Sequence, residues 1–533
     1  MPDKNTHLLD VILFSPILLN IIIALTSCSY IRKSVTSSTD QPRAQKMEGD
    51  RKEKLLKTVE EEEGEEEKLS LWKRVWKESK KMWIVAGPAI FNRISTFGIY
   101  IISQAFVGHI GSKELAGFAI VYTVFIRFAN GILLGMASAL ATLCGQAYGA
   151  KELSMMGVYL QRSWIVSFLT ALFILPLFIF TTPILRILGQ DESIAQEAGI
   201  ISLWSIPVMF SLFVSFTCQQ FLQSQSKNII IAFLAAFSLT IHVILSWLLT
   251  IQYKFGIVGA LTSTSLAFWI PNIGNLIFIT CGWCPDTWKG FSCLAFKDLW
   301  PVFKLSISAG AMLALELWYN TILVLLTGNM ENAEVQIDAL SICLNINGWE
   351  LMISFGFLAA ASVRVANELG KGSSKSAKFS VAVSVLTSLT IGFILFLFFL
   401  FFRERLAYIF TKNKDVVNAV GDLSPLLAVS ILLNSVQPVL SGVAVGAGWQ
   451  STVALVNLGC YYIIGLPVGI VLGNVFHWQV KGIWVGMLFG VAIQTIVLLI
   501  ICYKTDWDEQ VLKARNRVNR WSKVEPDHNK SDN

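Results

Sequence analysis

Twelve apolar segments of roughly twenty residues occupy residues 82–502, and the second six repeat the first six in the same order. Gly135 and Gly149, for example, precede Gly356 and Gly370 by 221 residues each. A helix rises about 1.5 Å per residue, so each segment can cross the roughly 30 Å of hydrocarbon in a bilayer. Six plus six spans in parallel order predict two six-helix lobes related by a pseudo-twofold axis along the membrane normal, which is typical of transporters.

The predicted fold is therefore an all-α polytopic membrane protein with twelve transmembrane helices. The chain is 54% hydrophobic and only 15% charged, with a mean hydropathy of +0.60, which an ordinary soluble domain does not show. In the first half the predicted spans are 82–107, 118–143, 163–180, 201–222, 229–251 and 257–282. In the second half they are 302–326, 339–363, 379–402, 423–445, 453–472 and 481–502.

Basic residues flank the spans and predict the orientation of the chain. Because Lys and Arg stay on the cytoplasmic side, the clusters at 73–81 and 515–520 place both tails in the cytoplasm and the acidic segment 328–338 outside. The predicted division is an N-terminal cytoplasmic tail 1–81, an N-lobe 82–282, a cytoplasmic inter-lobe linker 283–301, a C-lobe 302–502 and a C-terminal cytoplasmic tail 503–533.

The N-terminal tail contains an anomalous apolar run at 8–25, interrupted by Asp10. It is open to three interpretations: a cleaved signal peptide, a thirteenth helix, or sequence upstream of the true start. The first two would place the acidic run 60–67 on the far side of the membrane, against the Lys/Arg bias, so initiation near Met47 is favoured. The acidic run itself is predicted to be a solvated tail.

No ATP, metal or other cofactor is predicted. Cys281 and Cys284 have the spacing of a redox or metal-binding pair, but they lie at the end of a span without a βαβ context, so that alternative is disfavoured. The segment "GKGSSKS" at Gly370 lacks the spacing of a phosphate-binding loop. The net charge of +6 is assigned to membrane topology, so no nucleic-acid partner is expected. An ion gradient is the expected energy source, and it requires a titratable group buried among the helices.

Ionisable side chains within membrane spans are costly unless paired or hydrated, so each is a functional hypothesis. Glu316, in "LALELWYN", is predicted to carry the coupled proton, because burial favours the protonated form of a carboxyl group. The alternative is a carboxylate fixed in a helix contact. Glu350 is either a relay toward Glu316 or an interhelical hydrogen-bonding group. His242 is a third proton-coupling candidate, although a satisfied core histidine is favoured there.

Aromatic and amide side chains near Glu316 are predicted to bind substrate. The rings of Trp318 and Tyr319 could face planar or cationic molecules, although packing is the commoner role of such rings. The predicted set is completed by Asn345, Asn434 and Gln437. Two arginines in the first two spans, Arg93 and Arg127, could neutralise anionic groups, but structural pairing or snorkelling is favoured for both.

Several sequence blocks, in order along residues 69–508, resemble the multidrug and toxic compound extrusion (MATE) family, in its plant DETOXIFICATION branch. The resemblance implies a V-shaped pair of six-helix lobes and proton-coupled efflux of small organic compounds. The blocks are "ISQAFVGHIG" (102–111), "LCGQAYGAK" (143–151), "FLQSQSK" (221–227), "LELWY" (315–319), "NINGWE" (345–350), "RVANELG" (364–370) and "GAGWQ" (446–450).

The chain departs from the family pattern at three carboxylate positions. A glutamate common in plant members is Ala141 here, and the first-span aspartate of bacterial relatives is Ser103. An aspartate that commonly pairs with the seventh-span glutamate is Asn434. Among those positions only Glu316 is retained, which concentrates the expected coupling on the C-lobe. The short connection 145–162 argues against the citrate-exporting subgroup.

The residues and the resemblance together predict a proton-coupled antiporter that exports secondary metabolites or xenobiotics from the cytosol. Its expected partners are a small organic substrate, protons and the lipid bilayer, with the chain acting as a monomer in the vacuolar or plasma membrane. The alternatives are a flippase for lipid-linked substrates, a membrane receptor and a membrane enzyme. An enzyme such as an acyltransferase would need a His paired with Asp or Glu, and His242 has no such neighbour in sequence.

Overall fold

The structure is a computed structural model that describes residues 61, 64, 68–297, 299–327, 333–408, 410, 411 and 413–522. The apolar run 8–25, Met47 and residues 328–332 of the acidic loop lie outside these ranges. Within them the structure contains twelve helices long and apolar enough to cross a membrane, and no β-strand. The prediction of an all-α protein with twelve transmembrane helices is confirmed.

The first six spans form the N-lobe, with several helices continuing through short π-helical turns. Its elements are α4 (Leu71–Gly108), α5 (Ser112–Ile120), η2 (Val121–Ile126), α6 (Arg127–Gly149), α7 (Ser154–Ile179), α8 (Thr181–Ile187), α9 (Glu192–Trp204), α10 (Ile206–Ser224), α11 (Ile229–Ser246), η3 (Trp247–Gln252), α12 (Gly256–Phe278) and η4 (Ile279–Trp283).

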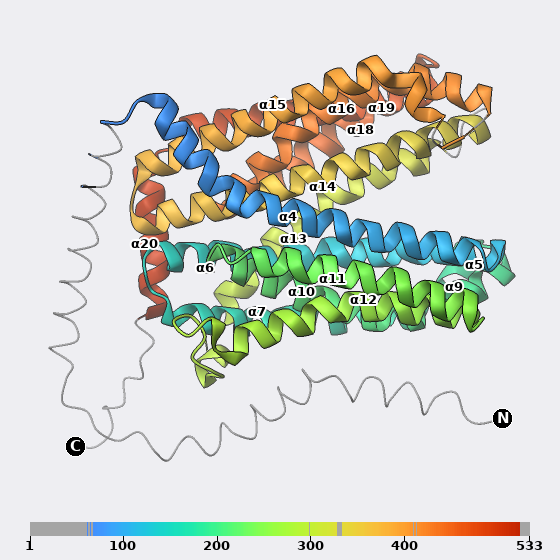
Figure 1. The fold of residues 1–533 in the computed structure, drawn as a ribbon. Coiled ribbons are helices and arrows are strands. Elements are labelled where there is room, and N and C mark those ends of the chain that lie inside the picture. Colours follow the sequence, from blue (N-terminus) through green and yellow to red (C-terminus); the bar gives the residue numbers. More distant parts are fainter. Residues whose placement is uncertain are drawn as a thin grey trace.

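A linker with one 3₁₀ turn leads into the C-lobe, and a short amphipathic helix follows the C-lobe in the C-terminal tail. The elements are η5 (Cys293–Phe296), α13 (Leu299–Thr327), α14 (Ala333–Lys371), α15 (Ser374–Ala407), α16 (Lys414–Ala447), α17 (Gln450–Asn457), η6 (Leu458–Gly465), α18 (Leu466–Ile470), η7 (Val471–Val475), α19 (Gln479–Lys504) and α20 (Trp507–Ser522). Figure 1 shows α14, α15, α16 and α19 in one group, α6, α10, α11 and α12 in another, and α4 between them.

The backbone repeats the symmetry that the sequence predicts. Lys151 and Gly372, 221 residues apart, both adopt left-handed φ angles, 59° and 97°, after the second and eighth spans. Ser226 and Gly448, 222 residues apart, do the same after the fourth and tenth, with φ of 59° and 83°. Left-handed residues commonly end helices, so equivalent spans of the two lobes end in the same way. Lys254 and Gly256, before the sixth span, correspond to His477 and Gln479 before the twelfth, and all four residues have left-handed φ angles.

The fourth span differs from its counterpart in the C-lobe. It consists of two helices, α9 and α10, which meet at Ser205 immediately before Ile206 and Pro207. Proline lacks a backbone N–H and favours the first turn of a helix, which explains the start of a new helix here. Its counterpart α16 instead runs without a break through Pro425 and Pro438.

The two lobes pack tightly where α20 crosses the bundle, at the left of Figure 1. A Cβ added at Gly149 of α6 would overlap the carbonyl oxygen of Asn367 in α14, and a Cβ added at Gly370 would overlap the carbonyl of Gln146. Both pairs are related by the same offset of 221, so they are one contact repeated by the pseudo-twofold axis. Only glycine permits this approach of the two helices.

Polar contacts reinforce the closure of the lobes at the α20 end. The Gln146 amide donates to the Gly446 carbonyl at 3.1 Å, and the Asn367 amide donates to the Ser224 carbonyl at 3.4 Å. On α20, Arg517 donates to the carbonyl of Ala447 at 2.9 Å, at the negative end of the α16 dipole. The lobes are therefore joined across this end by helix contacts, hydrogen bonds and α20.

A buried ion cluster ties the start of α4 to the C-lobe. The Arg364 guanidinium binds Glu78 through two hydrogen bonds of 2.7 and 2.9 Å and Glu368 at 2.6 Å. Ser380 also donates to Glu78, at 2.6 Å. A buried arginine is thus matched by two carboxylates, as burial of a charge requires.

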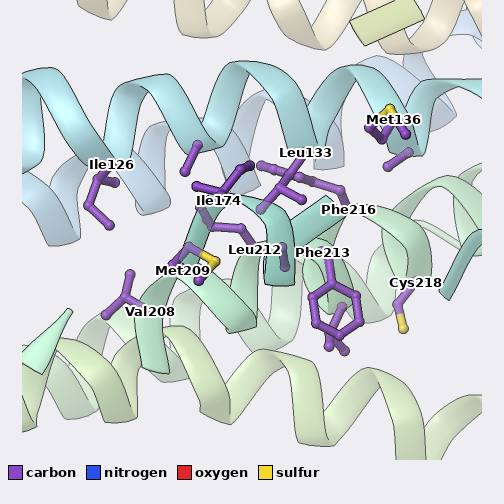
Figure 2. Packing of buried hydrophobic residues seen from close by; sticks show 14 of the residues in the cluster. Ile126, Leu133, Met136, Ile174, Val208, Met209, Leu212, Phe213, Phe216 and Cys218 are labelled. Atoms are coloured by element: carbon purple, nitrogen blue, oxygen red, sulfur yellow. The ribbon is translucent and has the colours of Figure 1, made fainter. Parts of the chain in front are cut away.

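The N-lobe core forms where α6 faces α10. Figure 2 shows Leu133 of α6 among side chains of α10 that include Met209, Leu212 and Phe216, with Met136 farther along α6. All five side chains are buried. This packing fixes α10 relative to α6, and both helices contribute side chains to the cavity described below.

Two exposed lysines test the predicted orientation. Lys289 lies in the linker near the α20 end, and Lys254 lies between η3 and α12. In right-side-out vesicles we expect an impermeant maleimide to label Lys254→Cys and to miss Lys289→Cys until the membrane is permeabilised. Both changes belong in a Cys281→Ser background, because Cys281 is exposed. If only Lys289→Cys is labelled in intact vesicles, the orientation of the chain is opposite to the predicted one.

Candidate functional site

Glu316 lies on α13, buried against α16 in the C-lobe. Its polar neighbours are Gln437 and Ser441 of α16, and the Gln437 amide donates to the Ser441 hydroxyl at 3.2 Å. The Oε2 atom of Glu316 has no hydrogen-bond partner among the described residues. The described residues therefore satisfy only part of the hydrogen-bonding capacity of an ionised carboxylate.

Glu350 lies on α14 and faces the same stretch of α16. Its carboxylate accepts a hydrogen bond of 2.6 Å from Ser354, and Asn434 is its neighbour on α16. Its Oε2 atom also lacks a partner among the described residues. Asn434 thus contacts Glu350, whereas Gln437 takes the place beside Glu316 that the family resemblance implied for position 434.

The residues of α16 that neighbour the two carboxyl groups lie within one helical turn of each other. Asn434 and Gln437 are three residues apart and so lie on the same face of the helix. Neither Glu316 nor Glu350 forms an ion pair with a described cation. Chemically, the arrangement can hold a proton on each carboxyl group in the absence of a compensating positive charge.

His242 lies apart from these carboxyl groups, on α11 in the N-lobe. Its Nε2 is 3.1 Å from the Ser103 hydroxyl, and its Nδ1 is 3.3 Å from the Ser263 carbonyl and 3.4 Å from the Ser246 hydroxyl. Ser103 also bonds with Thr264 at 2.8 Å. Neutral groups therefore satisfy both ring nitrogens, as in a structural histidine. The proton-coupling role of His242 stays a prediction.

A cavity of about 280 Å³ lies between the N-lobe and the edge of the C-lobe. Its walls come mainly from α4, α6, α10 and α12, with α14 closing one side. The polar side chains that line it include Asn92, Arg93, Arg127, Asn130, Gln219 and Asn347. Aromatic rings in the lining include Phe97, Tyr100, Tyr122, Phe216, Phe268 and Phe355.

Asn347 links this cavity to the C-lobe carboxyl groups. It lines the cavity, and its side-chain oxygen accepts a hydrogen bond of 3.1 Å from Asn434. Asn434 in turn neighbours Glu350. Two amide side chains, Asn347 in the wall and Asn434 behind it, therefore lie between the cavity and the buried carboxyl group of Glu350.

The structure does not bring all of the predicted substrate-binding residues to the cavity. Trp318 stacks on Phe128 of α6, with ring centroids 5.2 Å apart. Tyr319 is buried in the C-lobe, where it stacks on Tyr461 at 4.4 Å. Asn345 donates to the carbonyl of the preceding turn. None of these side chains, nor Asn434 and Gln437, lines the cavity, so their binding role stays a prediction.

Sequence reasoning passed over several amides that the structure places in the cavity wall. Asn92 on α4 donates to Gln219 on α10 at 3.1 Å, and Gln219 donates to Ser215 at 2.7 Å. The available signal was the presence of amide side chains within apolar spans, in "IFNRIS" and "TCQQF". Such groups need partners inside a membrane and so indicate a polar interior.

Both halves of the chain match one family profile, described as MatE, over residues 88–248 and 309–471. The chain belongs to the MATE family of transporters. Each match lies within one lobe and reaches from its first span to its fifth. Because its relatives are transporters, this MATE protein is assigned as an integral, multi-pass membrane transporter and not as an enzyme.

Similar sequences from the plant Arabidopsis thaliana cover most of the chain. Protein DETOXIFICATION 21 of Arabidopsis thaliana is 63% identical over 88% of this chain and 95% of the relative. Protein DETOXIFICATION 22 of the same plant is 60% identical over the same shares. The MATE chain therefore lies within the DETOXIFICATION group.

Solved structures agree with the two-lobed fold. The eukaryotic MATE transporter AtDTX14 is 32% identical, with a TM-score of 0.79 over 83% of this chain and 99% of that one. The Vibrio cholerae MATE transporter VcmN, in its bent form, is 16% identical and has a TM-score of 0.69 over 84% and 99%. The second likeness concerns the fold alone.

Proposed function

We propose that this MATE transporter exchanges protons for small organic solutes and exports secondary metabolites or xenobiotics from the cytosol. The observation that carries the proposal is the pair of buried carboxyl groups, Glu316 and Glu350, each with one unpartnered oxygen. Glu350 is connected to the cavity wall through Asn434 and Asn347. Proton binding and solute binding would therefore act on neighbouring parts of one polar network.

The energetics of the two carboxyl groups suggest how a proton could control the conformation. An ionised carboxylate without a cation or full hydrogen bonding is costly in a membrane interior. With the lobes packed as here, the protonated form of Glu316 avoids that cost, whereas its ionised form needs water. Opening the lobes admits water, so proton release would favour one conformation and proton uptake the other.

The lobes are proposed to move as two bodies, 82–282 and 302–502, joined by the linker 283–301. The linker is attached to the N-lobe: Gln161 of α7 donates to the Gly290 carbonyl at 2.9 Å and accepts from the Ser292 N–H at 2.8 Å. A fixed linker would restrict relative motion to the helix contacts between the lobes. We propose that one chain is sufficient for transport, in the vacuolar or plasma membrane.

The cavity volume favours a small solute over a lipid-linked substrate. About 280 Å³ is close to the ~300 Å³ lower end of small-molecule pockets. A lipid-linked molecule would also need a groove that opens laterally to the bilayer.

Vesicles with an imposed pH gradient test the proposal. We expect an acidic interior to drive accumulation of organic solutes from a compound panel, and we expect a protonophore to abolish it. ATP should have no effect, since the sequence contains no nucleotide-binding loop. Transport that continues without any ion gradient but stops when ATP is withdrawn would reject the antiport mechanism.

A further inference from the structure

We propose that the cavity is an organic-anion site, in which Arg93 and Arg127 bind the carboxylate of an aromatic acid. This inference rests on the proposed transport function and names its substrate class. The described lining of the cavity contains these two arginines and no aspartate, glutamate, lysine or histidine. The wall therefore carries two positive charges with no compensating negative charge of its own.

Neither arginine has the partners that a structural arginine would need. Arg93 lies over the ring of Phe216, 5.5 Å from its centroid, and donates no hydrogen bond to a described residue. Arg127 is exposed, and it forms no ion pair or hydrogen bond within the described part of the chain. Arg364, in contrast, is buried among two glutamates with hydrogen bonds of 2.6 to 2.9 Å. This chain matches a buried structural arginine with carboxylates, but leaves the two cavity arginines without them.

An unmatched guanidinium within a membrane span is unfavourable, and an incoming anion would offset that cost. The planar guanidinium also suits a carboxylate, because its N–H groups can bind both oxygens. Arg93 and Arg127 each lie about fifteen residues from the hairpin between α4 and α5, which places them at similar depth. Because both also line the same cavity, they can approach one carboxylate from two helices.

The remainder of the wall suits the body of an aromatic acid. Tyr100 and Tyr122 have ring centroids 5.8 Å apart, and Phe97 and Phe216 also line the space. Aromatic faces favour stacking and edge contacts with a planar ligand. With about 280 Å³ available, the site matches a ligand of one or two rings with a single carboxylate.

Three naphthalene probes of nearly one shape test the charge preference. They are 2-naphthoate, 2-naphthamide and 2-naphthamidine, which are an anion, a neutral molecule and a cation at pH 7. Binding is measured by calorimetry on the full-length protein in lipid nanodiscs, at one pH and without a gradient. We expect naphthoate to bind roughly tenfold or more tightly than naphthamide, because a charged hydrogen-bonded pair forms, and naphthamidine to bind most weakly.

Substitutions then identify the arginines. Arg93→Gln and Arg127→Gln should each weaken naphthoate binding by roughly 10- to 100-fold and change naphthamide binding by less than about threefold. Arg93→Lys should retain part of the preference, since it keeps the charge but loses the planar fork. Arg405→Gln, the same change at an exposed arginine on α15, is the matched control and should leave all three affinities unaltered.

The probe order in the unaltered protein needs no variant, so it decides the question even if a substitution impairs folding. Naphthamidine binding as tightly as naphthoate, or no saturable naphthoate binding, would overturn the proposal. A naphthoate preference that survives both Arg93→Gln and Arg127→Gln would overturn it as well. Because binding is measured without a gradient, a failure of proton coupling would leave this result unchanged, and the two hypotheses remain distinguishable.

Discussion

Adding a single methyl group at Gly149 or Gly370 is expected to drive the transporter out of the conformation seen here. The new Cβ would overlap a backbone carbonyl of the opposite lobe, at Asn367 or Gln146, and backbone cannot move aside as a side chain can. Overpacking of this kind costs about 1–3 kcal/mol, which shifts a two-state equilibrium by roughly 5- to 150-fold. Alanine favours a helix more than glycine does, so helix propensity alone would stabilise these variants. A loss of the closed conformation would therefore come from the contact between the lobes.

The shift can be measured as a distance between the lobes at the α20 end. Spin labels at two exposed positions report that distance by pulsed electron resonance: Lys289→Cys, in the linker that is attached to the N-lobe, and Lys375→Cys, on α15 of the C-lobe. We expect Gly149→Ala and Gly370→Ala to move the distribution to longer values and to reduce transport. Gly87→Ala is the control, since its Cβ would meet only a Trp83 ring atom at 4.0 Å. Unchanged distances in both variants would contradict the assignment of this contact as the closure point.

The second large effect is expected at Glu316. Glu316→Gln keeps the shape and hydrogen-bonding capacity of the side chain, but an amide cannot exchange a proton near neutral pH. We expect the protein to fold and to lose at least about 90% of its pH-driven transport, because the coupled proton has no other equivalent carrier at the positions typical of the family. Transport rates at matched membrane levels, across a series of imposed pH gradients, provide the measurement.

Two further substitutions serve as comparisons for Glu316→Gln. Glu350→Gln tests the second buried carboxyl group, and a comparable loss would show that the two act together. Glu509→Gln is the matched control, because Glu509 is exposed on α20 and its 2.9 Å ion pair with Lys513 is a surface pair of little energetic weight. If Glu316→Gln retains the pH-driven flux of the unaltered protein, the proton site lies elsewhere, with Glu350 and His242 next in line.

The spans and their repeat could be predicted from the sequence because the bilayer demands long apolar helices. The ends of the helices could not, since a helix continues beyond the hydrocarbon wherever polar contacts support it. α4, for example, begins at Leu71, eleven residues before the predicted span, and Glu78 in that extension binds Arg364. The helix α20 was also not predicted, although the apolar residues of this tail recur at helical spacing; it packs on both lobes.

The candidate site was predicted less completely, for reasons of helix geometry. Tyr319 is three residues after Glu316 and so lies on nearly the same face of α13, which points into the C-lobe. Trp318 is rotated away and packs on Phe128 of the N-lobe. Sequence proximity to Glu316 therefore did not place either ring in the cavity. That cavity is formed by helices distant in sequence, and only their packing brings Arg93 and Arg127 to one space.

The measurement that tests the central claim most directly is proton movement driven by substrate alone. Purified protein in liposomes, with equal pH on both sides and a transported solute on one side, should move protons against the direction of solute flux, as a trapped pH dye would record. Glu316→Gln liposomes should show no such proton movement. Solute flux through the unaltered protein without any accompanying pH change would contradict proton-coupled exchange.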